Sequence, residues 1–79
     1  MEKQEIQAKV KQVVARVLKM EAAEIADDAN FVFDLGADSM QSLELVAGLE
    51  EEFEIEMDQD RALEIQSIDR AVDFIEEYL

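Results

Sequence analysis

Apolar residues recur at helical spacing in three separate segments of this chain, and no segment shows the alternating pattern of a β-strand. This periodicity predicts long helices over residues 3–18, 39–53 and 68–79. A shorter helix is expected over residues 59–65, where apolar positions are fewer. The sequence therefore predicts an all-α fold, a small four-helix bundle of three longer helices and one short helix.

The two glycines and the first long connection add local detail to this expectation. Residues 19–38 form a connection that is long for a compact domain, and such connections are usually functional or contain a turn of helix. A short turn is expected over residues 22–25, and a tight turn at Gly36. Gly48 falls inside the second long helix, where glycine costs about 1 kcal/mol relative to alanine; this cost either indicates close packing or has no structural meaning.

Length and composition limit the function classes that the chain can serve. Its 79 residues are expected to form a single domain over 1–79, burying about 60% of the unfolded surface. Cysteine and histidine are absent, so no disulfide or thiolate metal site forms and the usual general base is missing. The acidic run over 50–60 lacks the glycine of a calcium-binding loop. Catalysis and a dedicated metal site are therefore disfavoured.

The net charge of −14 is unevenly distributed along the chain. Residues 20–60 contain fourteen acidic side chains and no basic one, whereas five basic side chains lie in residues 1–19. Such a surface repels nucleic acid and anionic lipid, and it attracts proteins that have basic patches. No apolar run is long enough for a membrane span or a signal peptide. We expect a cytoplasmic monomer without stable membrane association.

The stretch DLGADSM, from Asp34 to Met40, places a serine at the start of the second long helix. Asp38 is the expected N-cap, and Gln41 then completes a capping box. The hydroxyl of Ser39 either helps to cap the helix or remains free as an attachment point. A helix N-terminus favours an anionic group, so a phosphodiester on Ser39 would be well accommodated.

The longer stretch DLGADSMQSLELVAGLEEEF, residues 34–53, resembles the signature of the acyl carrier proteins. That signature reads Asp-Leu-Gly-x-Asp-Ser-Leu and continues into an acidic helix that ends in Glu-Glu-Phe. The resemblance covers almost the whole chain, including the valine-rich first helix and the apolar stripe over 68–75.

The resemblance implies a non-catalytic carrier. Ser39 would bear 4′-phosphopantetheine, transferred from coenzyme A by a phosphopantetheinyl transferase. The reactive thiol would then lie on the prosthetic arm, and acyl groups would travel on it as thioesters between the enzymes of fatty-acid synthesis.

Two further sets of residues are assigned on this basis. Partner enzymes with basic patches are expected to bind a surface of the second long helix, made of Asp38, Met40, Leu43, Glu44, Ala47, Glu50 and Glu51. An expandable pocket for the acyl chain is expected to be lined by Phe31, Leu49, Ala62, Ile65 and Ala71.

Several positions depart from the usual pattern of the family. An aromatic residue, Phe33, stands where an acidic one is frequent; the other departures are Lys19, Met40, Gln41 and Asp58. Two alternatives to a fatty-acid carrier therefore remain. One is a specialised carrier of a polyketide or lipid-modification pathway, and the other is an acidic adaptor that is never modified.

Overall fold

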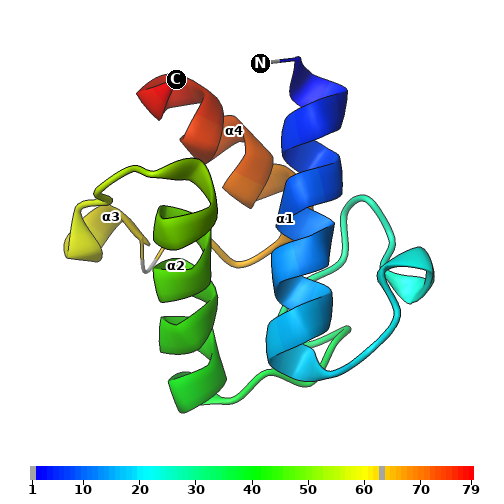
Figure 1. The fold of residues 1–79 in the computed structure, drawn as a ribbon. Helices are drawn as coiled ribbons and strands as arrows, with labels where there is room; N and C mark the ends of the chain where they lie inside the picture. Colours follow the sequence, from blue (N-terminus) through cyan, green and yellow to red (C-terminus); the bar gives the residue numbers. More distant parts are fainter. Residues whose placement is uncertain (1, 63) are drawn as a thin grey trace.

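The chain folds into an all-α bundle in the computed structural model, which describes residues 2–62 and 64–79 (Figure 1). Helix α1 packs against both α2 and α4, while the short α3 lies beside α2 on the side away from α1 (Figure 1). The predicted fold class is confirmed. In chain order, the elements are α1 (Lys3–Leu18), the 3-10 turn η1 (Ala22–Glu24), α2 (Ser39–Phe53), α3 (Gln59–Ala62) and α4 (Ile68–Tyr78).

Helix α1 has the predicted bounds, and the predicted apolar stripe forms its buried face. Ile6, Val10, Val13 and Val14 are completely or almost completely buried. The helix ends at Leu18, and the next residue, Lys19, is its C-cap and has a left-handed backbone with a φ of 56°. Glycine usually occupies such a C-terminal position, and a side chain there costs about 1 kcal/mol.

Helix α2 buries Leu45, Leu49 and Phe53 on the face that contacts α1 and the rest of the core. The helix approaches α1 closely at Gly48, because a Cβ built at this position would lie 2.8 Å from Cγ1 of Val13. Of the two interpretations of Gly48, the structure therefore supports close packing.

The short elements agree with the sequence in position but not always in length. The turn predicted over 22–25 is present as η1. The helix predicted over 59–65 is shorter, since α3 comprises Gln59–Ala62 and position 63 lies outside the described residues. Two hydrogen bonds of the 3-10 type follow α3. Glu64 N–H donates to the Arg61 carbonyl at 3.0 Å, and Ile65 N–H donates to the Ala62 carbonyl at 3.1 Å. These bonds are tighter than those of an α-helix.

The long first connection is fastened to the segment that precedes α4. Phe31 N–H donates to the Gln66 carbonyl at 2.9 Å, and Ile68 N–H donates to the Ala29 carbonyl at 3.0 Å. These two bonds flank an isolated antiparallel bridge between Asn30 and Ser67. The connection is thereby held opposite α2, and the two together enclose the site described next.

Candidate functional site

A tight loop presents Ser39 at the surface. Gly36 has a φ of 75°, which confirms the turn predicted there. The next residue, Ala37, is buried, and its N–H donates to the Phe31 carbonyl at 2.8 Å. Because the chain is anchored immediately before α2 begins, Ser39 emerges as the first helical residue and is exposed to solvent.

Asp38 caps the helix, as predicted, and leaves the Ser39 hydroxyl free. Gln41 N–H donates to Asp38 Oδ1 at 2.8 Å, while Asp38 N–H donates to Gln41 Oε1 at 3.0 Å. The Ser42 hydroxyl donates to the Asp38 carbonyl at 3.0 Å. None of the side-chain hydrogen bonds found within residues 2–62 and 64–79 involves Ser39 Oγ. The capping interpretation of this serine is therefore wrong.

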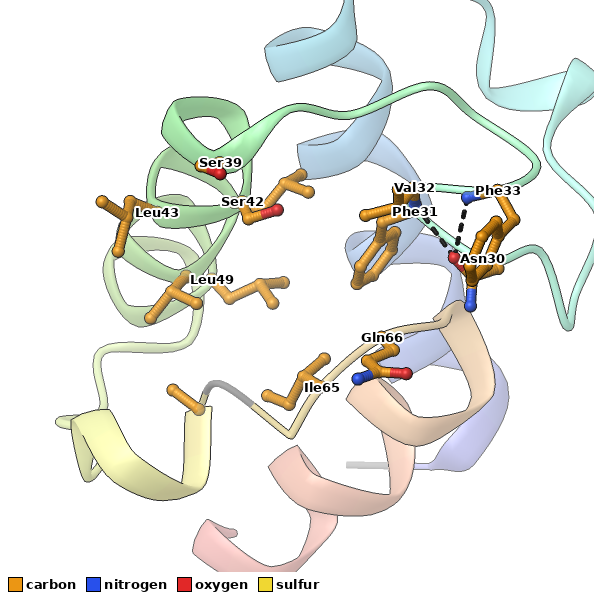
Figure 2. Close-up of a pocket in the computed structure, with 13 residues that line it drawn as sticks. Asn30, Phe31, Val32, Phe33, Ser39, Ser42, Leu43, Leu49, Ile65 and Gln66 are labelled. Atoms are coloured by element: carbon orange, nitrogen blue, oxygen red, sulfur yellow. Dashed lines mark hydrogen bonds between the residues drawn. The ribbon is translucent and has the colours of Figure 1, made fainter.

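An open apolar cavity of about 540 Å³ lies beside Ser39, between α2 and the first connection (Figure 2). This volume is within the range of sites that bind small molecules. Four residues predicted for an acyl pocket line it, namely Phe31, Leu49, Ala62 and Ile65. The structure does not place the fifth, Ala71, in the cavity wall. Helix α4 packs against α1, and Ala71 is fully buried in the closed core on that helix.

Sequence reasoning missed much of the cavity wall. Leu43, predicted only for partner binding, also lines the cavity. The helical spacing of Leu45 and Leu49 could have indicated which residues of α2 line the cavity. No sequence pattern indicated which residues of the first connection line it. The wall residues that were not predicted for any site are Asn30, Val32, Phe33, Ser42, Leu45, Val46 and Gln66.

Asn30 organises the loop side of the cavity. Its Oδ1 accepts the N–H of Val32 at 3.0 Å and the N–H of Phe33 at 2.9 Å (Figure 2). Its own N–H donates to Asp34 Oδ2 at 2.7 Å. Asparagine commonly stabilises turns in this manner, so the loop has a defined backbone despite its exposed position.

The predicted partner surface is largely available to solvent. Met40 is 72% and Leu43 62% exposed, which excludes core packing as the explanation for this apolar patch. Asp38, Glu44, Ala47 and Glu51 are exposed beside them.

Glu50 differs from the other residues of this surface. It is half-buried, and its Oε2 accepts the N–H of Met57 at 3.0 Å. Its carboxylate thus also holds the connection that follows α2.

Two further properties of residues 2–62 and 64–79 concern metal binding and membrane insertion. No group of three or more histidine, cysteine, aspartate or glutamate side chains within that part of the chain could hold a metal ion. No helix formed by those residues has both the length and the apolar character needed to cross a membrane.

Comparisons with known proteins agree with this geometry. Residues 8–75 match the family described as "Phosphopantetheine attachment site". An acyl carrier protein of Guillardia theta is 44% identical over 75 residues, which cover 95% of this chain and 93% of that protein. A solved structure assigned to an acyl carrier protein of Mycobacterium tuberculosis superimposes with a TM-score of 0.85 and 23% identity, over 94% of this chain and 99% of the other.

The fold and the family match define the chain as a phosphopantetheine-binding carrier domain. Together with the identity to a curated relative, they show that the chain belongs to the acyl carrier proteins, which carry acyl groups rather than catalyse their reactions. The residues present fit the prosthetic group, since an exposed hydroxyl without a hydrogen-bond partner among the described residues lies at the rim of an apolar cavity.

Proposed function

We propose that Ser39 is the attachment residue for 4′-phosphopantetheine. The observation that carries this proposal is the exposed Ser39 hydroxyl at the rim of the cavity. Because Asp38 caps the helix, this hydroxyl is not needed as a cap. The oxygen of Ser39 attacks the coenzyme A phosphorus that bears the pantetheine. The bond to 3′,5′-adenosine diphosphate breaks, and a base of the transferase takes the hydroxyl proton. The positive end of the α2 dipole favours the resulting phosphodiester.

The cavity beside Ser39 is proposed to shelter the acyl chain that the arm carries. Its wall is mainly apolar, with Phe31, Leu49 and Ile65 among its residues. A saturated chain that enters the cavity leaves water, and it therefore stabilises the folded state that binds it.

Partner enzymes are proposed to dock on the exposed face of α2. Asp38, Glu44 and Glu51 supply negative charge, while Met40 and Leu43 supply an apolar patch. A phosphopantetheinyl transferase and acyl-transferring synthase enzymes that have basic patches would be steered to this face. Because exposed charges are screened by salt, the affinity of these complexes should fall as ionic strength rises.

The pathway is proposed to be fatty-acid synthesis, with the carrier acting as a monomer in the cytoplasm. The overall likeness of the signature in residues 34–53 to that of freestanding fatty-acid carriers supports this assignment. A specialised carrier of a polyketide or lipid-modification pathway is the second candidate. The observation that favours it is Phe33, an aromatic residue that is 88% exposed near the cavity. Assays of which synthase enzymes load the modified protein distinguish the two.

Intact-protein mass spectrometry tests the attachment residue. The purified protein is incubated with coenzyme A and a promiscuous phosphopantetheinyl transferase, and we expect a mass gain of one phosphopantetheine group. Ser39→Ala should show no gain. Ser42→Ala is the matched control, since Ser42 lies in the same helix and the same cavity wall and should leave the gain unchanged. Equal modification of Ser39→Ala, or no modification of the unchanged protein, contradicts the proposal.

A further inference from the structure

Phe33 is exposed to an extent that no other phenylalanine of this chain approaches. Its side chain is 88% exposed, whereas Phe31, Phe53 and Phe74 are 3%, 7% and 8% exposed. Its neighbour Val32 is 51% exposed. An aromatic ring left in water forgoes a large part of the free energy that its burial would supply. A ligand that covers Phe33 and Val32 would therefore gain free energy from the contact.

The backbone fixes the position of this ring. The N–H groups of Val32 and Phe33 both donate to Asn30 Oδ1, at 3.0 and 2.9 Å, and Asp34 Oδ2 accepts the N–H of Asn30 at 2.7 Å. Asp34 N–H closes the turn by donating to the Asn30 carbonyl at 3.0 Å. The loop thus presents Phe33 from a hydrogen-bonded turn, and the exposed ring is a built feature of the cavity wall.

The ring belongs to the same cavity as Ser39. Phe33 and Val32 line the cavity from the first connection, while Ser39 and Leu43 line it from α2 (Figure 2). A flexible chain that is attached to Ser39 and enters the cavity therefore starts at α2. The apolar side chains of Val32 and Phe33, which we call the loop rim, line the other side of the same cavity.

Three occupants are conceivable for the loop rim, and the tethered cargo fits best. A second copy of this chain carries the same net charge of −14 and is repelled. A partner protein is proposed to dock on the exposed face of α2, whereas Phe33 belongs to the first connection, on the other side of the cavity. A chain tethered to Ser39 meets neither obstacle, and its attachment gives it a high effective concentration at the rim.

We propose that Phe33 is a specificity-determining residue that retains long apolar cargo, by covering the bound acyl chain at the loop rim of the cavity. The inference rests on the proposed attachment at Ser39. Covering about a third of the ring surface shifts the equilibrium toward the sheltered cargo about tenfold, which corresponds to about 1.4 kcal/mol. An acetyl group is too short to gain this contact, so Phe33 discriminates between long and short cargo.

The test compares three variants that are first loaded and weighed intact. Phe33→Ala removes the ring, and Phe33→Leu restores an apolar side chain. Leu79→Ala is the matched control, because Leu79 is 56% exposed and belongs neither to the cavity wall nor to the proposed docking face. Each protein is loaded with a hexadecanoyl or an acetyl group. The readouts are the rate of thioester cleavage by hydroxylamine and the rise in Tm relative to the form that bears no acyl group.

We expect hydroxylamine to cleave the hexadecanoyl thioester about tenfold faster in Phe33→Ala than in the unchanged protein, with a smaller rise in Tm on acylation. Phe33→Leu and Leu79→Ala should behave much like the unchanged protein. The acetyl forms should all react at one rate. The Tm of the unmodified protein should not change, because exposed side chains contribute little to folding.

Two results would overturn the inference while leaving the attachment at Ser39 intact. One is equal protection of the hexadecanoyl thioester in Phe33→Ala and the unchanged protein, with full loading of both. The other is an equal acceleration of cleavage of the hexadecanoyl and acetyl thioesters in Phe33→Ala, which would show that the ring does not discriminate by cargo length. Failure of the attachment itself is seen separately, as equal mass gain in Ser39→Ala.

Discussion

At the scale of single residues, the packing of α2 on α1 depends on the absence of a side chain at Gly48. A Cβ there would lie 2.8 Å from Cγ1 of Val13, a β-branched residue that is fully buried and has little freedom to move. Alanine improves helix propensity by about 1 kcal/mol, but overpacking in a core costs about 1–3 kcal/mol. The close contact should therefore outweigh the gain in propensity.

We predict that Gly48→Ala lowers the free energy of unfolding by about 1 kcal/mol. In the background of Val13→Ala, which removes the atom that the new methyl group meets, the same change should become neutral or stabilising. Chemical denaturation of the four proteins gives a double-mutant cycle. Additive effects of the two substitutions would contradict the steric explanation.

Lys19 provides a second test at the residue scale, because its backbone has a φ of 56°. Lys19→Gly and Lys19→Ala both remove the charge, and only the first relieves the left-handed conformation. We expect Lys19→Gly to be more stable than Lys19→Ala by about 1 kcal/mol in thermal unfolding. Equal stability of the two variants would mean that the conformation carries no measurable cost.

At the scale of elements, α4 is stabilised at its N-terminus by two neighbouring side chains. Arg70 N–H donates to Asp69 Oδ1 at 3.0 Å and to Ser67 Oγ at 3.4 Å. The hydroxyl of Ser67 also donates to the Asp69 carboxylate, and this hydrogen bond is the main reason that the pKa of Asp69 lies below its ordinary value of 3.8. A carboxylate near a helix N-terminus is further favoured by the dipole.

The lowered pKa of Asp69 predicts how its contribution to stability depends on pH. The contribution is fully present above pH 3.8, and it is lost as the pH falls through the lower pKa of the folded state. Asp69→Asn should thus be less stable than the unchanged protein at neutral pH, and the difference should shrink under acid conditions. Thermal melts over a pH series measure it.

A carboxyl titration by NMR supplies the control for this prediction. In Ser67→Ala, the pKa of Asp69 should return toward 3.8, because its strongest hydrogen bond is lost. A pKa of Asp69 that is the same in Ser67→Ala and the unchanged protein would contradict the assigned cause.

At the scale of the whole molecule, the net charge of −14 opposes the compact state. The ion pairs found among the described residues are exposed or partly exposed: Lys3 pairs with Asp73 at 3.3 Å, Arg61 with Glu77 at 2.7 Å, and Lys11 with Asp27. Pairs of this kind contribute little each, so they offset only part of the repulsion.

Salt should therefore stabilise the protein as a whole. We expect Tm to rise by about 5 °C from very low to physiological ionic strength, which corresponds to about 1 kcal/mol for a domain of this size. Magnesium and calcium should act alike, since no metal-binding group is found in residues 2–62 and 64–79. A Tm that does not change with salt would contradict the inferred charge repulsion. A much larger rise in Tm with one cation than with the other would indicate a specific binding site.

Periodicity determined the three long helices, because each buries one apolar face against the core, and their bounds to within a residue, since α4 ends at Tyr78 rather than at 79. The DLGADSM motif and its capping box likewise determined how Ser39 is displayed, since a cap involves only neighbouring residues. The chemical role of Ser39 was inferred from the resemblance of this motif to the signature of the acyl carrier proteins. These features are local in the chain, and a single sequence contains them.

The cavity and its rim were decided by the tertiary structure. Asn30 and Gln66 are far apart in sequence and meet only because the first connection pairs with the segment before α4. That same pairing holds Phe33 at the opening and leaves Ala71 in the closed core. Contacts between distant segments decide which face of a loop points to a cavity. Hydrophobic periodicity indicates helices and strands, and it does not predict those contacts.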